Sequence, residues 1–186
     1  MREKSEELAG TMALEMGKPL TQGRTEVEKC AFVCEYYATH AESFLSPYEV
    51  STDMSESRVV YEPLGSIFAV MPWNFPLWQV FRAAAPIMMS GNTMLLKHAP
   101  RVPRTALSIE KMCLQSGFPQ GALSNVFASN EQASKIISDR TVKGVCLTGS
   151  GAAGSAVASQ AGRYLKPVLL ELGGSDPYIV LEDADL

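Results

Sequence analysis

Residues 71–99, MPWNFPLWQVFRAAAPIMMSGNTMLLKHA, decide the fold of this chain. They join an apolar run, a Trp-Asn pair between two prolines, a helix-like stretch, a second apolar run and a lysine. Pro72 and Pro76 fix their φ angles and lack a backbone N–H, so Trp73 and Asn74 are expected in a rigid turn beyond a strand end. Parallel α/β sheets bind their ligands at that edge.

The alternation of apolar runs and helix-like stretches continues along the chain. Strands are expected at 66–71, 92–97, 124–127, 142–147 and 166–170, followed by a last apolar run, Tyr178–Leu181. Helices are expected near 77–89, 103–116, 131–138 and 151–162. This order predicts βαβ units, and therefore an α/β fold with a Rossmann-like open parallel sheet and helices on both faces.

The two ends of the chain differ from this central pattern. Residues 2–16 and 24–45 read as amphipathic helices, and 48–52 with 58–61 as a possible β-hairpin. We therefore expect an N-terminal unit over 1–62, with a possible oligomerisation hairpin, and a sheet domain over 63–186. Residues 182–186, EDADL, resemble the acidic first turn of a helix, which predicts that the chain is cut from a longer protein.

Composition narrows the classes of partner. The 186 residues carry a net charge of -4 with a pI near 5.3, which argues against a nucleic-acid partner. The N-terminus lacks a signal peptide, and prolines break the apolar stretch 64–81, so no membrane span is expected. The four cysteines form no CxxC pair and have no neighbouring histidines, which predicts no metal site and a reduced, cytoplasmic protein.

Polar side chains follow four of the expected strands. They are Asn74, Lys97, the Thr148-Gly149-Ser150 run and Glu171. Carboxyl ends of parallel strands meet at one edge of a sheet, so these side chains make a candidate ligand site.

A glycine pattern marks one of these strand ends. Gly149 to Gly154 reads GSGAAG, which matches G-x-G-x-x-G at the start of an expected helix. Such glycines let backbone N–H groups approach a pyrophosphate, and Glu171 lies 22 residues after Gly149, where an acidic ribose ligand would be. The alternative is a small-residue helix that packs closely on the sheet.

Four motifs in order carry a family resemblance: Pro72-Trp73-Asn74-Phe75-Pro76, Leu95-Leu96-Lys97, Leu147-Thr148-Gly149-Ser150 with Gly154, and Glu171-Leu172-Gly173-Gly174. Together they resemble the NAD(P)-dependent aldehyde dehydrogenase superfamily over nearly the whole chain, most of all its bacterial succinate-semialdehyde dehydrogenases. The resemblance implies oxidation of an aldehyde through a cysteine thiohemiacetal and a thioester, in a protein that is a homodimer or homotetramer at full length.

The resemblance also implies two catalytic roles. Asn74 matches the oxyanion donor of the family, and its alternative is an amide that satisfies its own turn. Glu171 matches the general base, and its apolar neighbours predict a partly desolvated carboxylate. We prefer the base to the ribose ligand because Lys97 then contacts the ribose.

Cofactor contacts implied by the resemblance are Pro72, Trp73, Lys97, Ala99, Gly149, Ser150, Gly154, Leu172 and Gly173. Many NAD-preferring relatives carry an acidic residue three positions after the lysine, where this chain has Pro100. A 2′-phosphate then meets less repulsion, and Lys97 with His98 could attract it. We therefore expect NADP to be tolerated or preferred beside NAD.

Substrate contacts follow in the same way. Arg82 occupies the position at which semialdehyde dehydrogenases carry a carboxylate-binding arginine, and Trp78 could form an apolar wall beside it. The alternative for Arg82 is pairing with a surface acid.

None of the four cysteines, at positions 30, 34, 113 and 146, lies in the catalytic context of the family. We therefore expect that the Cys-bearing catalytic domain is absent and that the chain alone is inactive. The competing interpretations are a non-catalytic nucleotide-binding module and an oligomerisation piece.

Overall fold

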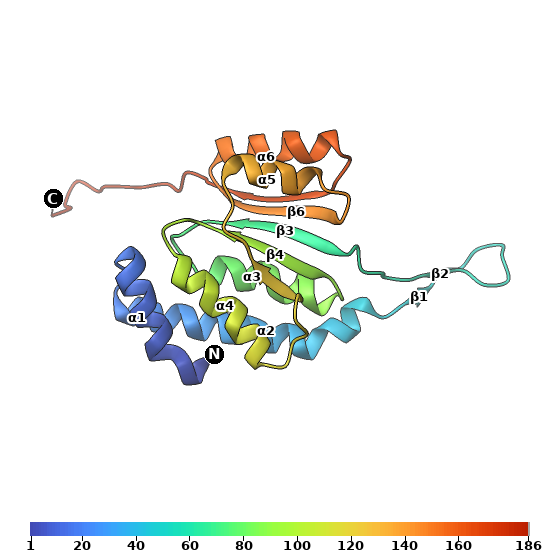
Figure 1. Ribbon diagram of the computed structural model, residues 1–186, viewed down its shortest axis with the longest axis horizontal. Helices are drawn as coiled ribbons and strands as arrows, with labels where there is room; N and C mark the ends of the chain where they lie inside the picture. Colours follow the sequence, from blue (N-terminus) through green and yellow to red (C-terminus); the bar gives the residue numbers. More distant parts are fainter. Residues whose placement is uncertain (186) are drawn as a thin grey trace.

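The computed structural model describes residues 1–185 and contains a five-stranded parallel sheet between two helical layers (Figure 1). The strands are β3 (Ser66–Met71), β4 (Thr93–His98), β5 (Leu123–Asn125), β6 (Val142–Gly149) and β7 (Val168–Leu172). The helices are a 3₁₀ turn η1 (Arg2–Lys4), α1 (Ser5–Met16), α2 (Leu20–Leu45), α3 (Trp78–Met89), α4 (Pro103–Gln115), α5 (Asn130–Ser138) and α6 (Gly151–Arg163). The predicted α/β class and parallel sheet are confirmed.

The strand order is β5-β4-β3-β6-β7, and every neighbouring pair is parallel. The chain builds outward from β3 through β4 to β5, returns to the other side of β3 with β6, and ends at β7. This reversal creates a switch point between β3 and β6, where open α/β sheets leave a crevice at the carboxyl ends of their strands.

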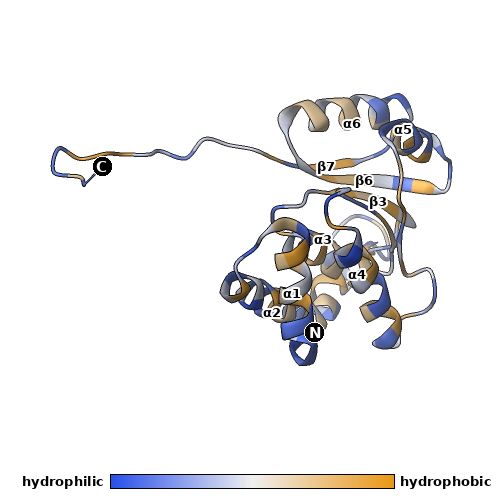
Figure 2. Ribbon diagram, turned by 60° about the vertical axis from the view of Figure 1, so that its left-hand side comes forward, coloured by the Kyte–Doolittle hydropathy of each residue, from blue (hydrophilic) through white to orange (hydrophobic). Residues whose placement is uncertain are grey.

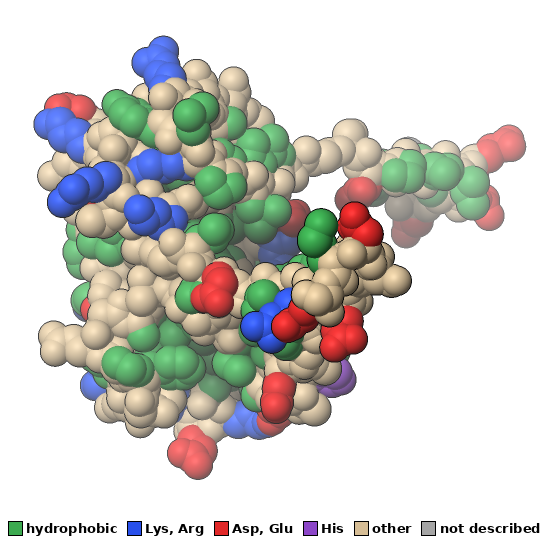
Figure 3. Space-filling model, turned by 90° about the vertical axis from the view of Figure 1, so that its right-hand side faces the viewer, with side chains coloured by type: hydrophobic (Ala, Val, Ile, Leu, Met, Phe, Trp, Pro, Cys, Tyr) green, Lys and Arg blue, Asp and Glu red, His purple; other side chains and the backbone are tan. Residues whose placement is uncertain are grey.

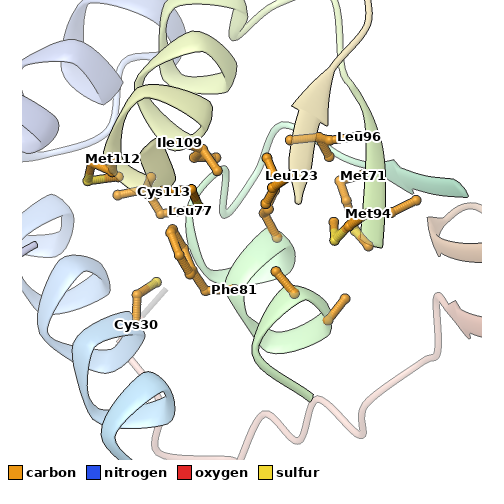
Figure 4. Packing of buried hydrophobic residues seen from close by; sticks show 14 of the residues in the cluster. Cys30, Met71, Leu77, Phe81, Met94, Leu96, Ile109, Met112, Cys113 and Leu123 are labelled. Carbon is orange, nitrogen blue, oxygen red and sulfur yellow. The ribbon is translucent and has the colours of Figure 1, made fainter. Parts of the chain in front are cut away.

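Both faces of the central strands β3, β4 and β6 are covered, which explains why these strands are nearly continuous apolar runs. Ile67, Ala69 and Met71 belong to the core beneath α1–α4, whereas Phe68 and Val70 pack with α5 and α6. In Figure 1 these two layers lie below and above the sheet. Figure 4 shows the larger core, in which Cys30 of α2 points toward Phe81 of α3.

The N-terminal elements differ in detail from their predicted bounds. Helix α2 begins at Leu20, directly after Pro19, rather than at residue 24. The expected hairpin is present, but β1 (Tyr48–Glu49) and β2 (Arg58–Val59) pair through only two residues each. This pair projects away from the sheet (Figure 1).

The C-terminal segment leaves the sheet after β7 (Figure 2). The run Tyr178–Leu181 forms no strand within residues 1–185, because it pairs with no other strand there, and its four side chains are exposed. Residues 182–183 form a turn rather than the predicted start of a helix, and Leu186 lies outside the described residues. Among residues 1–185, no helix has the length and apolarity that a membrane span requires.

Candidate nucleotide-binding and catalytic site

The register of the strands places the predicted site residues along the carboxyl edge. Val70 of β3 is aligned with Lys97 of β4 and with Leu147 of β6, and Thr148 of β6 is aligned with Glu171 of β7. Lys97 and Glu171 are therefore three strands apart, or about 14 Å at the usual spacing of about 4.8 Å. This distance suits a ligand of nucleotide length.

Lys97 belongs to a cavity of about 200 Å³ between α5 and α6. The floor is formed by Val70, Lys97 and Leu147, and the walls by Asn130, Ala133, Ser134, Ile137, Ala153, Ala156, Val157 and Gln160. Short side chains on the facing sides of the two helices leave this space open. This cavity was not predicted from the sequence, although the alanines of α6 indicate a helix face with room beside it.

The ammonium group of Lys97 has no protein partner within residues 1–185, because its Nζ makes no hydrogen bond or salt bridge there. The residue as a whole is only 8% exposed. Burial lowers the pKa of Lys97, because water no longer fully solvates the charged form. An unpaired, partly desolvated cation that lines a cavity favours an anionic or hydroxyl-bearing ligand there.

The start of α6 supplies a second binding element. Ser150 is the N-cap, and its Oγ accepts from the N–H of Ala153 at 3.2 Å. A helix N-terminus of this kind binds phosphate through its free N–H groups and its dipole. Gly149 ends β6 directly before this cap.

The three glycines of the G-x-G-x-x-G pattern, Gly149, Gly151 and Gly154, differ in how much space surrounds them. A Cβ added at Gly154 would lie 2.5 Å from Cδ2 of Leu172, whereas nothing lies within 4 Å at Gly151, and the closest atom at Gly149 is 3.6 Å away. Gly154 therefore permits close packing of α6 on β7, as in the small-residue alternative. Leu172 contributes this contact, and Gly173 is exposed beyond the strand.

Asn74 lies in the turn between β3 and α3. It is exposed, and its side-chain amide makes no hydrogen bond within residues 1–185, so it does not satisfy its own turn. Pro72 is half-buried before it, and the guanidinium carbon of Arg101 lies 5.3 Å from the ring centroid of Trp73. The amide is thus available to a ligand.

His98 connects the Asn74 turn to β4. Its Nδ1 accepts from the N–H of Ala99 at 2.8 Å, so its Nε2 carries the proton and donates to the carbonyl of Pro76, also at 2.8 Å. Burial lowers the pKa of His98, which favours this neutral form. Because both ring nitrogens are hydrogen-bonded within the protein and the ring is neutral, the prediction that His98 attracts a 2′-phosphate is wrong.

Glu171 contacts Arg82 across the carboxyl edge. Its Oε2 lies 3.1 Å from Nη1 of Arg82, and Nη2 of the same guanidinium donates to Oγ1 of Thr148 at 3.2 Å. The Glu171 side chain is 48% exposed, so the partial desolvation predicted from its neighbours is not found. The reason is that Glu171 and Leu169 are on the face of β7 that no helix covers.

That uncovered face borders a groove of about 390 Å³ between α3 and the β6–β7 pair, with Arg82, Cys146 and Leu169 among its lining residues. Figure 3 shows a hollow between the upper and lower parts of the molecule, with hydrophobic side chains on its walls.

The site therefore spans two faces of the sheet. Lys97 and its cavity lie on the α5–α6 face, whereas Glu171 and Arg82 lie on the α3 face. The three residues Asn74, Lys97 and Glu171 share an edge but not a single pocket. A ligand that reaches all of them must pass over the carboxyl edge at the switch point.

Trp78 lines a separate cavity of about 500 Å³, together with Glu26, Lys29 and Phe75. The ammonium of Lys29 lies 3.9 Å from the ring centroid of Trp78. The contact between Lys29 and Trp78, the residue expected to form an apolar wall, was not predicted from the sequence, because α2 lies far from Trp78 along the chain.

The four cysteines are all at least partly buried. Burial raises the pKa of Cys30, Cys34 and Cys146, and raises that of Cys113 to about 11. A thiol that keeps its proton at neutral pH reacts slowly, because the thiolate is the reactive form.

Comparisons with known proteins agree with this geometry. The model of the aldehyde dehydrogenase family matches residues 1–186. The chain is 50% identical to a Synechocystis sp. (PCC 6803) protein named probable succinate-semialdehyde dehydrogenase (NADP(+)), over 100% of this chain and 41% of that protein. It is 47% identical to the Escherichia coli K12 succinate semialdehyde dehydrogenase (NAD(P)+) Sad, over 100% of this chain and 40% of the relative.

A solved structure gives the same result. The succinic semialdehyde dehydrogenase of Streptococcus pyogenes, crystallised with NADP+, superposes with a TM-score of 0.93 at 43% identity, over 99% of this chain and 40% of that one. The chain thus spans about two fifths of the length of the relatives it matches. Because the family model matches all 186 residues of the chain and a related enzyme has the same fold, this chain belongs to the aldehyde dehydrogenase family.

Proposed function

We propose that this chain is the cofactor-binding part of an NADP+-dependent succinate-semialdehyde dehydrogenase. The observation that carries the proposal is the ammonium of Lys97, which has no partner within residues 1–185 and belongs to a largely buried residue in a cavity beside the switch point of the sheet. The names of the relatives, which specify succinate semialdehyde with NADP+ or NAD(P)+, support the choice of substrate and cofactor.

The described residues fit a dinucleotide in two parts. The α5–α6 cavity and Lys97 would hold the adenosine half and its 2′-phosphate, and the N-terminus of α6 at Ser150 would bind the pyrophosphate. Trp73, in the turn after β3, and Ala99, directly after β4, would flank its path across the carboxyl edge. When bound, NADP+ supplies the hydride acceptor of the oxidation.

Asn74 and Glu171 would act on the other face of the sheet. The free amide of Asn74 would donate to the oxyanion that forms at the aldehyde carbon, a contact worth about 10²–10³ in rate in related chemistry. Glu171 would accept the proton of the attacking thiol or water. We propose that the nucleophilic thiolate comes from outside this chain, because all four of its thiols have raised pKa values.

Arg82 would bind the carboxylate of the substrate. Its guanidinium already pairs with one carboxylate, that of Glu171, and this supports the assignment. A substrate carboxylate at Arg82 would displace Glu171 and leave it free to act as the base. The apolar stem of the substrate would then lie in the groove that Arg82 lines, with Trp78 one helical turn away on α3.

The N-terminal unit would serve assembly. Residues 1–62 end in a two-residue β-pair, and such a short hairpin gains stability mainly by pairing with further strands. We infer a homodimer or homotetramer in which β1 and β2 contact another subunit. Residues 63–186 would be the NADP-binding domain.

The purified natural gene product that contains this sequence tests the proposal. We expect NADP+-linked oxidation of succinate semialdehyde, and we expect Arg82→Ala to lower kcat/KM for this substrate about tenfold or more, because a charged hydrogen bond contributes about 1.5–3 kcal/mol. Butanal, which lacks the carboxylate, should be oxidised equally well by both proteins. A parent without NADP+-linked aldehyde oxidation would exclude the function, and an unchanged kcat/KM in Arg82→Ala would exclude the role of Arg82.

A further inference from the structure

The turn that carries Asn74 is fixed by a side chain from α2. Oε1 of Glu26 accepts from the backbone N–H of Leu77 at 2.8 Å and from that of Trp78 at 2.9 Å. These N–H groups are at the start of α3, and Leu77, the N-cap, provides no side-chain hydrogen bond. Glu26 therefore supplies, from 51 residues away, the cap that the local sequence lacks.

Glu26 is itself held in a buried ion pair. Its second carboxylate oxygen, Oε2, pairs with the ammonium of Lys18, and the two residues are only 4% and 5% exposed. Lys18 also lies 4.0 Å from the ring centroid of Phe75, the residue directly after Asn74. The pair is thus confined between α2 and the turn.

Consecutive residues after Asn74 are held from outside the turn. Lys18 lies over Phe75, His98 binds the carbonyl of Pro76, and Glu26 binds the N–H groups of Leu77 and Trp78. The side-chain amide of Asn74 has no hydrogen bond of its own within residues 1–185. Its direction is therefore determined by the backbone that these contacts fix.

We propose that Glu26, paired with Lys18, is a positioning residue that aims the Asn74 amide at the reacting carbonyl oxygen. The proposal rests on the proposed function, in which Asn74 is the oxyanion donor. A misplacement of about 1 Å in such a group can cost about 10²-fold in rate. Glu26 touches neither substrate nor cofactor, so it acts only through Asn74.

Two double variants separate the effect of the hydrogen-bond acceptor at position 26 from the effects of its charge and its volume. Lys18→Met/Glu26→Gln removes both charges but keeps a side-chain oxygen for the two N–H groups. Lys18→Met/Glu26→Leu has a similar volume and no acceptor. Each is made in the natural gene product, with Asn74 intact and with Asn74→Ala, and kcat and the KM for NADP+ are measured for succinate semialdehyde.

With Asn74 intact, we expect the Leu variant to have a kcat about 10- to 100-fold below that of the Gln variant. In the Asn74→Ala background the two should have equal kcat, because no amide remains to be aimed. The KM for NADP+ should be the same in all four proteins, since Lys97 lies on the opposite face of the sheet. A merely structural role would lower kcat by the same factor in both backgrounds.

Glu28→Ala is the matched control. Glu28 is on the same helix and also pairs with a cation, Arg2 at 2.9 Å, but it is exposed and remote from the turn. We expect its kcat to equal that of the parent. If the Leu variant does not fold, Lys18→Met/Glu26→Asn replaces it, because its shorter side chain draws the oxygen away from both N–H groups.

The outcomes separate this proposal from the proposed function. Equal kcat of the Gln and Leu variants with Asn74 intact would overturn the positioning role, and so would equal fold losses in both backgrounds. An inactive parent would overturn the function instead. In that case the side-chain amide resonances of Asn74, measured by NMR in this chain, replace kcat: a difference between the Gln and Leu variants supports positioning, and identical resonances refute it.

Discussion

Replacing Lys97 by Met should lower the affinity for a 2′-phosphate ligand but raise the stability of the chain without ligand. The substitution keeps a long side chain in the α5–α6 cavity but removes the ammonium, which is partly desolvated and has no partner within residues 1–185. The chain without ligand should become more stable, because it no longer holds an unpaired charge in a partly desolvated position. A gain of about 1 kcal/mol would raise Tm by roughly 2–4 °C for a chain of this size.

The loss of affinity follows from the contact that the cavity offers. Two unit charges about 4 Å apart attract by about 4 kcal/mol at an effective dielectric constant of about 20. Desolvation and ordering reduce this, and a hydrogen bond to a charged group contributes about 1.5–3 kcal/mol net. The Kd for a 2′-phosphate ligand should therefore rise about 10- to 150-fold.

Adenosine 2′,5′-bisphosphate is the suitable probe, since it represents the adenosine half of NADP and needs no catalytic residue. Its Kd is measured by isothermal titration calorimetry on this chain, with 5′-AMP as the comparison ligand. Lys111→Met, which changes an exposed lysine of α4, is the control and should leave both Kd values unchanged. An unaltered bisphosphate Kd in Lys97→Met, or a fall in Tm, would refute the reasoning.

Three further changes give distinct outcomes. Gly154→Ala places a Cβ 2.5 Å from Cδ2 of Leu172 and should lower the free energy of unfolding, measured with urea, by about 1 kcal/mol. Gly162→Ala, whose Cβ would have nothing within 4 Å, should raise the free energy of unfolding by up to about 1 kcal/mol. Equal effects of the two substitutions would contradict the close packing at Gly154. Burial lowers the pKa of His98 from its ordinary 6.5, so the unfolded chain binds the proton more tightly and stability should fall as pH decreases below about 6.5. His98→Gln should reduce that slope between pH 7 and pH 5, and an identical slope would assign it to other groups. Pro100→Glu should weaken the bisphosphate relative to 5′-AMP by like-charge repulsion, and an unchanged ratio of their Kd values would remove the argument for NADP.

Much of the fold could be predicted from the sequence because the strands are continuous apolar runs buried on both faces. The runs at 66–71 and 142–147 became β3 and β6 with bounds almost unchanged. The run at Tyr178–Leu181 is also apolar, but it forms no strand and its side chains are exposed, because no strand pairs with it within residues 1–185. An apolar run therefore predicts a buried strand only where a neighbouring strand is present to pair with it.

The candidate site was predicted only in its outline. Strand ends in a parallel sheet share an edge, so the placement of Lys97 and Glu171 on that edge followed from the pattern. Lys97 and Glu171 nevertheless lie on opposite faces of the sheet. Which face each side chain occupies depends on the register between strands, and the sequence pattern of a single strand does not show that register. The cap of α3 by Glu26 joins residues 51 positions apart, and no local motif predicts such a contact.

A crystal structure of this chain with NADP+ would show whether the Lys97 cavity binds the cofactor. We expect the adenosine between α5 and α6, its ribose and 2′-phosphate beside Lys97, and the pyrophosphate at the start of α6. NADP+ bound in the groove between α3 and β7, or anywhere that leaves the Lys97 ammonium without a ligand contact, would contradict it.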